Sequence, residues 1–393
     1  MLDLGYNASL VALGAGMLGI AGGVVGSFLF LRKRSLVSDA ISHATLPGVA
    51  LAFIVMVAFG GEGRNLFGLM LGSALAAAAG LLSVGWLTRR TRLSEDAAIG
   101  AVLSVFFGFG VVLLTVIQTM SAGRQAGLEG YLLGSTAGML RTDAVIIAVG
   151  GLLTLVAVYV LRRVLVLTAF DSEYAASVGI DPNKADLALM GLVLAVTVVG
   201  LKIVGLILIV ALLILPPVTA RFWTDRAGHL ALIAGAIGGV AGFLGAVISA
   251  SAPDLPTGPI IVLVAFAFFA VSMLLAPRRG VLAALVAHLR FRDRVHRRQG
   301  LLALAQGQAI HEALTLRILR RAGLIRGDGV ATEAGRAQAA KALLDERRWQ
   351  ILRAGDRTGS LSARYDGLTP IETVLTPDQV AEIDRHLRPE ALA

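Results

Sequence analysis

The sequence has no cysteine in 393 residues, and its only lysines are Lys33, Lys184, Lys202 and Lys341. The lack of cysteine excludes thiolate metal sites and disulfides. No lysine follows a glycine, so the GxxxxGK[ST] phosphate loop is absent and the chain is not itself a P-loop ATPase. Charged residues make up only 16%, whereas 56% are hydrophobic and the mean hydropathy is +0.79. This composition predicts an integral membrane protein.

The distribution of the few charges divides the chain at about residue 280. Residues 1–280 hold 17 Lys and Arg and 13 Asp and Glu, while the much shorter stretch 281–393 holds 18 and 13. The sequence therefore predicts a transmembrane domain over 1–280 and a basic soluble tail over 281–393.

Apolar runs in the first domain predict about nine transmembrane helices. They lie at roughly 8–31, 44–60, 66–87, 97–120, 143–161, 186–202, 203–220, 229–250 and 258–276. The run from Leu187 to Pro217 is too long for one span and short for two. A split is therefore placed near Lys202, and eight spans remain the alternative.

The basic residues predict the orientation of these spans. With nine spans, thirteen Lys and Arg fall on the side of Arg32, and four fall on the other side, namely Arg64, Arg124, Arg141 and Lys202. Because Lys and Arg favour cytoplasmic loops, the N-terminus is expected outside and the tail in the cytoplasm. The expected location is a bacterial cytoplasmic (inner) membrane.

The stretch from Arg32 to Leu51 places polar groups inside a predicted span. Helical spacing puts five polar residues on one face, namely Ser35, Ser38, Asp39, Ser42 and His43. Asp39 and His43 are one turn apart, and Pro47 cannot donate a hydrogen bond to the carbonyl of residue 43, which predicts a helix break. A carboxylate, an imidazole and a freed carbonyl suit a divalent metal ion. The alternative is a helix cap at Asp39 and an interior histidine with its hydrogen bonds satisfied, although ionisable groups at membrane depth are usually functional.

A second polar segment, AFDSEYAASVGI, lies on the expected cytoplasmic side. It predicts a short helix with Asp171 as the N-cap and Gly179 at the C-terminal end. One interpretation is a solvated connector between spans. The other is a docking surface for a soluble partner.

Four segments resemble the permease subunits of ATP-binding-cassette importers for manganese, zinc or iron. They are SLVSDAISHATLPGVALAF, FDSEYAASVGI, VGLILIVALLILPPVTAR and DLPTGPIIVL, in this order and spacing. The resemblance implies that Asp39 and His43 bind the transported metal. It also implies that the helix from Asp171 to Ile180, with Glu173 and Gly179, docks on the ATPase.

The same resemblance implies the partners. They are two copies of an ATPase subunit, an extracytoplasmic metal-binding protein and a second copy of this chain. One carboxylate and one imidazole are too few ligands for a first-row metal, whereas a two-fold axis along the pore brings together two of each. This oxygen and nitrogen set fits Mn²⁺, Zn²⁺ or Fe²⁺ without choosing among them, and no permanently bound cofactor is expected.

The tail begins with a cationic segment, and residues 288–298 are expected to contact anionic lipid of the inner leaflet. Residues of about 308–390 resemble the winged-helix region of diphtheria-toxin-repressor-type regulators, with a hairpin turn at Gly327–Gly329. The positions that hold metal ligands in that family carry Glu346 and Glu372 but no histidine. Metal sensing by the tail is therefore disfavoured, and DNA is its least favoured partner.

Taken together, the sequence predicts an all-α polytopic membrane protein with a small cytoplasmic winged-helix-like α+β C-terminal domain. The expected function is that of a permease, and ATP hydrolysis is left to a partner subunit. The alternative is a membrane-anchored, metal-responsive transcription regulator, although nine spans exceed what an anchor needs.

Overall fold

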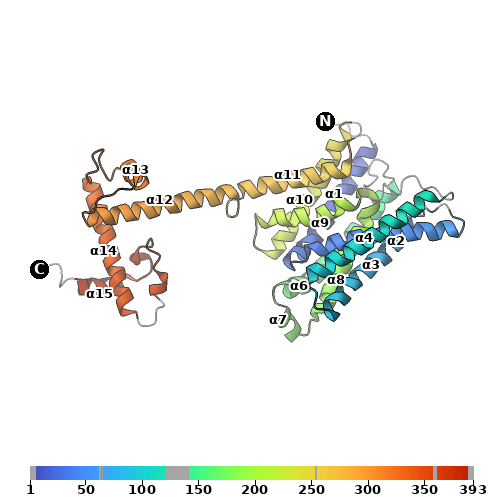
Figure 1. Cartoon of the computed structure of the whole chain (residues 1–393), viewed down its shortest axis with the longest axis horizontal. Helices are drawn as coiled ribbons and strands as arrows, with labels where there is room; N and C mark the ends of the chain where they lie inside the picture. The colour runs from blue at the N-terminus through green and yellow to red at the C-terminus, as the bar shows by residue number, and fades with distance from the viewer. Residues whose placement is uncertain are drawn as a thin grey trace. The chain divides into compact units, whose positions relative to one another are not determined.

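The computed structural model describes residues 6–61, 63, 65–120, 141–252, 255–356 and 361–387. The chain forms two compact units, Met1–Leu282 and Ala283–Ala393, and each is described by itself (Figure 1). Arg64 and Arg124, which were expected on the outer side of the membrane, lie outside the described residues.

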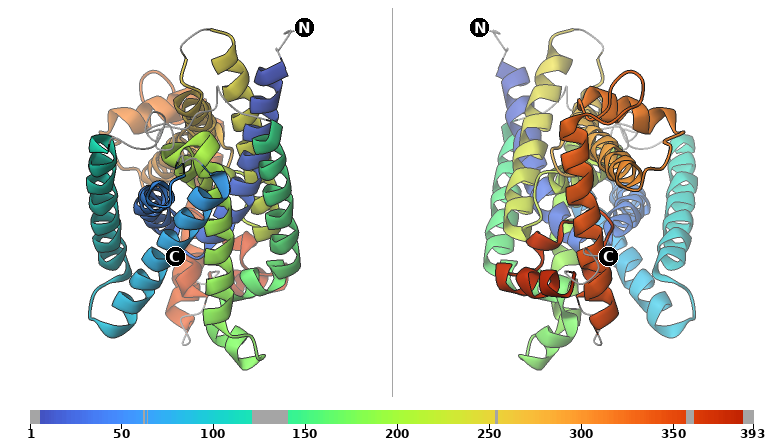
Figure 2. Two further views of the ribbon diagram at one scale, coloured as in Figure 1. Left: turned by 90° about the vertical axis from the view of Figure 1, so that its right-hand side faces the viewer. Right: turned by 90° about the vertical axis from the view of Figure 1, so that its left-hand side faces the viewer.

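The first unit is a helical bundle (Figures 1 and 2). Its described helices are α1 Tyr6–Leu31, α2 Ser35–Ala58, α3 Leu66–Arg90, α4 Glu95–Thr119, α6 Arg141–Phe170, α7 Ser172–Ser177, α8 Pro182–Val204, α9 Leu206–Arg221, α10 Ala227–Ala250 and α11 Thr257–Leu275. Local side chains define several of the starts, since Asn65, Ser94 and Asp181 each accept a hydrogen bond from a backbone N–H of the first turn.

Eight of the described helices are long and apolar enough to cross a membrane. The exception among the nine predicted spans is α9, whose 16 residues measure about 24 Å at 1.5 Å per residue, less than the ~30 Å hydrocarbon core. The expected split of the Leu187–Pro217 run near Lys202 is present, and it falls at Gly205. Gly205 has a φ of 78°, a conformation that glycine adopts without steric cost.

Glycine-mediated packing holds the centre of this unit together. The helix α1 is buried along most of its length and packs against α10, α6, α9 and α8. A Cβ atom at Gly19 would overlap the backbone carbonyl of Gly238 on α10, and a Cβ at Gly238 would overlap the carbonyl of Gly19. Small residues allow this close approach of two backbones, and the resulting packing stabilises the association of helices in lipid.

We expect Gly19→Leu to destabilise the membrane unit, because backbone atoms of α10 occupy the space that the side chain needs. Overpacking of this kind costs about 1–3 kcal/mol or more, which corresponds to a loss of about 2–12 °C in Tm at about 2–4 °C per kcal/mol. Thermal unfolding of the purified protein in detergent measures it. Gly191→Leu is the matched control, because a Cβ at Gly191 meets open space. An equal loss of Tm in both variants would contradict the packing argument.

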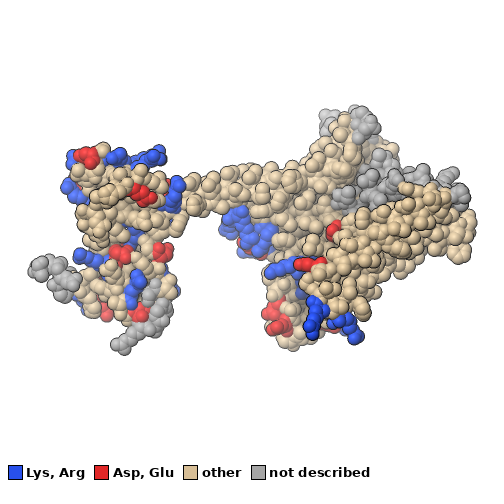
Figure 3. Space-filling view, in the orientation of Figure 1, with Lys and Arg blue, Asp and Glu red and all other residues tan. Residues whose placement is uncertain are grey.

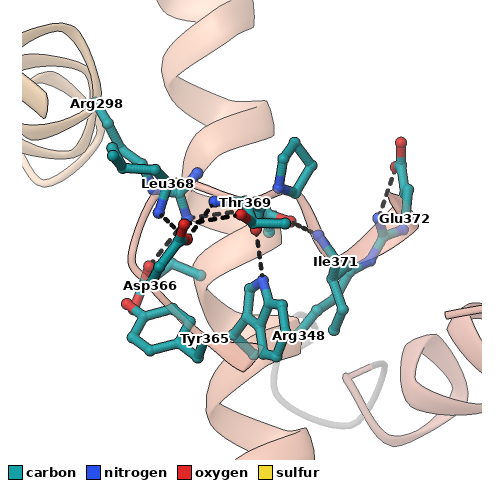
Figure 4. A network of polar contacts seen from close by, with 12 residues as sticks. Arg298, Arg348, Tyr365, Asp366, Leu368, Thr369, Ile371 and Glu372 are labelled. Atoms are coloured by element: carbon teal, nitrogen blue, oxygen red, sulfur yellow. Dashed lines mark hydrogen bonds and ion pairs between the residues drawn. The ribbon is translucent and has the colours of Figure 1, made fainter. Parts of the chain in front are cut away.

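The second unit is built from helices and turns. Its elements are α12 Val281–Ala305, which begins at the end of the first unit, α13 Ala313–Arg321, α14 Glu333–Gly355, the short 3₁₀ helices Ser362–Arg364 and Ile371–Thr373, and α15 Pro377–Leu387. Trp349 on α14 is fully buried and donates from Nε1 to the carbonyl of Thr369 at 3.0 Å, and Asp345 accepts from the backbone N–H of Ile371 at 2.8 Å (Figure 4). These bonds attach the segment before α15 to α14.

The predicted α+β winged-helix tail is not supported, because the described part of the tail contains no β-strand. The turn at Gly327–Gly329 is present, and the N–H of Arg326 donates to the carbonyl of Val330 at 2.9 Å. Only an isolated antiparallel bridge between Ile325 and Ala331 flanks this turn. Thr332 already caps α14, since its hydroxyl accepts from the N–H of Gly335. The helix therefore begins too soon after the turn for two strands to form.

Candidate functional site

Asp39 and His43 lie one turn apart on α2, which packs against α3 and α4. Asp39 Oδ1 lies 3.4 Å from His43 Nε2, and their side chains are 35% and 21% exposed. Most of the surrounding α2 residues, from Val37 to Ala50, are buried. The pair is thus the polar, accessible part of a helix that is otherwise packed against protein.

The neighbouring serines do not share this accessibility. Ser38 and Ser42 are fully buried, and their hydroxyls donate to the carbonyls of Ser35 and Ser38 at 2.6 and 2.8 Å. They were grouped with Asp39 and His43 on one polar face of the predicted helix. In the folded protein the serine hydroxyls bond to their own helix, so the outward polar groups are the carboxylate and the imidazole.

The environment of His43 leaves one ring nitrogen unsatisfied. The imidazole stacks edge-on against Phe107 of α4, with ring centroids 4.9 Å apart and planes at 86°. His43 Nδ1 is buried and has no hydrogen-bond partner among the described residues. Because a buried polar atom without a partner costs about 1–3 kcal/mol, it indicates a missing ligand or water.

Pro47 was predicted to break the helix beside this pair, and this prediction is wrong. The helix α2 continues through Pro47 from Ser35 to Ala58. The next residue, Gly48, packs so closely on Gly72 of α3 that a Cβ would overlap the Gly72 carbonyl. Neighbouring helices of a membrane bundle hold a proline-containing helix in place in this way. Position 47 still donates no N–H to the carbonyl of His43.

The described part of one copy of the chain supplies too few side-chain ligands for a complete metal site. Within the described residues, no group of three or more His, Cys, Asp or Glu side chains comes together in a geometry that could hold a metal ion. Asp39 and His43 provide one oxygen and one nitrogen ligand. These two side chains alone do not complete the coordination of a first-row metal ion.

The second predicted site forms the short helix α7 at one end of the bundle (Figure 2). Asp171 is its N-cap, since Oδ1 accepts from the N–H of Tyr174 at 2.8 Å, and Gly179 ends it with a φ of 84°. Glu173 is exposed, and Tyr174 and Val178 are exposed by half or more. Of the residues in α7 itself, only Ala175 is buried. The helix is thus anchored by one small side chain and presents the rest of its surface.

A cluster of charges beside α7 was missed by the sequence analysis. Arg32 donates to Asp186 of α8 and to the carbonyl of Thr168 of α6, while Arg34 pairs with Asp186 and with Glu95 of α4. We call these four side chains, Arg32, Arg34, Asp186 and Glu95, the α2-entry cluster. It joins the start of α2 to the helices on both sides of α7. The partners are up to 154 positions apart, so no local sequence pattern predicts them.

The carboxylates that resembled repressor metal ligands are engaged by arginines in the second unit. Glu346 accepts from Arg298 at 3.0 Å and from the hydroxyl of Tyr365, and Glu372 pairs with Arg348 at 3.1 Å (Figure 4). Burial, followed by the hydrogen bond to Glu346, raises the pKa of Tyr365 to about 12, so this hydroxyl stays protonated and donates. These ion pairs and bonds give both carboxylates a structural role.

The fold and these two sites define a class, that of multi-pass helical membrane proteins with an ionisable pair inside a span. The sequence comparison narrows this class to one family. Residues 6–276 match the model of the ABC 3 transport family, and the chain belongs to this family.

Individual relatives are similar to this chain over most of its length. The protein is 41% identical over 298 residues to the manganese transport system membrane protein MntC of Bacillus subtilis (strain 168), which covers 76% of this chain and 67% of the relative. It is 40% identical over 277 residues to the zinc transport system membrane protein TroC of Treponema pallidum (strain Nichols), with 70% and 91% covered. Among solved structures, PsaBC from Streptococcus pneumoniae in complex with Fab matches with a TM-score of 0.61 and 30% identity, over 70% of this chain and 93% of that one.

Proposed function

We infer that this chain is the membrane-spanning permease subunit of an ABC importer that moves a divalent transition metal into the cytoplasm. The observation that carries the inference is an accessible Asp39–His43 pair within a span of a chain that belongs to the ABC 3 transport family. Its relatives are named as manganese and zinc transport proteins. The regulator alternative is disfavoured, because the family match covers the whole membrane unit.

The cargo is Mn²⁺, Zn²⁺ or Fe²⁺, bound by Asp39 and His43 at one step of its passage. Since one copy offers two ligands, two copies related by a two-fold axis along the pore supply two carboxylates and two imidazoles. The accessibility of the pair on the surface of one copy supports this arrangement. The metal is cargo, and the chain itself is a transport subunit that leaves ATP hydrolysis to its partner.

Conformational changes of the ATPase are transmitted to the metal ligands through α7 and the α2-entry cluster. We place the ATPase against α7, with Asp171 and Gly179 shaping the helix and Glu173 on its exposed surface. A displacement of α7 moves the end of α6 and the start of α8. Arg32 contacts both, through Thr168 and Asp186, and lies immediately before α2. Because Asp39 lies just over one turn into α2, movement of the cluster changes the position of the metal ligands.

The cytoplasmic side is the end of the bundle that carries α7. Figure 3 shows Lys and Arg gathered at this end of the membrane unit, while the rest of the described surface on the face in view is almost free of charge. This distribution follows the preference of basic residues for the cytoplasm. If α9 crosses together with the eight longer helices, the N-terminus lies outside and the tail in the cytoplasm.

We assign the tail a stabilising or regulatory role at the membrane. Residues 288–298 of α12 are mostly exposed, and five of the eleven are exposed arginine or histidine residues, namely His288, Arg290, Arg292, Arg294 and Arg297. Such a segment suits the anionic inner leaflet, whereas DNA is the partner that we favour least.

Reconstituted vesicles test the transport function directly. Vesicles that hold this chain and its cognate ATPase should take up ⁵⁴Mn²⁺ or ⁶⁵Zn²⁺ in an ATP-dependent manner when the extracytoplasmic binding protein is added. A Walker-motif variant of the ATPase that cannot hydrolyse ATP is the control. Uptake of neither metal, nor of ⁵⁵Fe²⁺, from an assembly that hydrolyses ATP would refute the proposed function.

A further inference from the structure

Two cavities adjoin each other in the membrane unit, far along the chain from Asp39 and His43. The first is an apolar groove of about 500 Å³ between α9, α10 and α11, lined by side chains such as Ile233, Ile237 and Phe268. The second, of about 230 Å³, is a basic pocket lined by Arg221, Arg226, His229, Arg278 and Arg279. Trp223 lines both cavities.

The junction lies where these helices end. The groove is formed mainly by α10 and α11, which are long enough to span a membrane, together with the end of the shorter apolar helix α9, whereas the basic pocket is formed by the α9–α10 connection and the residues after α11. Trp223 donates from Nε1 to the hydroxyl of Ser272 at 2.9 Å, which fixes the indole between the two cavities. Tryptophan is enriched at the depth of lipid headgroups, and the arginines lie on the side that we assign to the cytoplasm.

The pocket carries more positive charge than its own carboxylate neutralises. Asp225 pairs with Arg221 at 3.3 Å and also with Arg279. Among the described residues, Arg226 and Arg278 have no carboxylate partner, and both are exposed. Two guanidinium groups beside an apolar groove thus remain available for an anion, and arginine binds phosphate oxygens through paired N–H donors.

We propose that these two cavities together bind one anionic phospholipid of the inner leaflet. The phosphate lies in the basic pocket with Arg226 and Arg278, and an acyl chain lies along the groove beside Ile237. A soluble anion would not require the apolar groove, and an apolar protein segment would not require the arginines. Basic pockets between membrane helices on the cytoplasmic side are known to bind phospholipid headgroups.

Native mass spectrometry of the full-length protein in detergent tests this proposal. The probes are phosphatidylglycerol and phosphatidylcholine with the same acyl chains. We expect the wild-type chain to retain phosphatidylglycerol preferentially, and Arg226→Gln/Arg278→Gln to lower this preference about thirtyfold, since each basic residue contributes about 1 kcal/mol. Arg92→Gln/Arg163→Gln is the matched control, because these exposed arginines lie at the same end of the bundle and line neither cavity.

A second variant tests the apolar half. Ala236→Trp places a large side chain in the groove, and we expect lower retention of phosphatidylglycerol while the arginines remain in place. The Tm of each variant without added lipid shows whether it is folded. An unchanged preference in a folded pocket variant, or an equal loss in the control, overturns the proposal. Loss of the ATPase with unchanged lipid retention also overturns it and assigns the pocket to the ATPase.

Discussion

Asp39→Ala and His43→Ala are each expected to abolish ATP-driven metal uptake, with a loss of at least ~100-fold. Mutation of groups that merely orient metal ligands typically costs 10–100-fold, so removal of a ligand should cost more. In a two-fold assembly each substitution also removes two ligands at once. Uptake of ⁵⁴Mn²⁺ or ⁶⁵Zn²⁺ into the reconstituted vesicles measures the effect.

Ser42→Ala is the control on the same helix. The Ser42 hydroxyl is buried and bonded to the carbonyl of Ser38, so its removal changes α2 without touching the proposed ligands. We expect its uptake to stay near that of the wild type. Membrane abundance and co-purification of the ATPase show whether each variant assembles. Normal uptake by an assembled Asp39→Ala or His43→Ala variant would rule out a direct ligand role.

Cysteines placed at Ser172 or Ser177 are expected to crosslink to the ATPase and stop ATP-driven uptake. Both serines are exposed on α7, and the chain has no native cysteine to compete. A covalent bond across this contact would prevent α7 from moving relative to the ATPase. Crosslinking to single-cysteine ATPase variants, read by gel shift, and uptake by the crosslinked assembly measure the two effects.

Ser251→Cys is the control for the coupling experiment. Ser251 is also exposed, but it follows α10 and therefore lies at the opposite end of the bundle from Arg226. It should not crosslink to the ATPase. Crosslinks from Ser251→Cys, together with none from Ser172→Cys or Ser177→Cys, would reverse the orientation and remove α7 from the coupling route.

The sequence alone was sufficient to predict the membrane fold, the family and most of the helices. Apolar runs of span length must pair all their backbone groups internally, so they become helices wherever they pack. The cap at Asp171 and the glycine at position 179 were also predictable, because helix caps and positive-φ glycines depend on interactions within a few residues. Asp39 and His43 could be singled out because an ionisable pair contrasts with apolar surroundings.

The tertiary structure decided what depends on contacts between distant residues. The helix α2 continues through Pro47 where Gly48 packs closely on Gly72 of α3, so the predicted break is absent, and the early start of α14 leaves no room for the expected strands. The charge cluster that joins Arg32 to Asp186, and the basic pocket beside the apolar groove, exist because helices far apart in the sequence end at the same place. Local periodicity carries no information about which helix ends meet. Packing alone determines which helix ends meet, because each helix can bury its small residues against only a few partners.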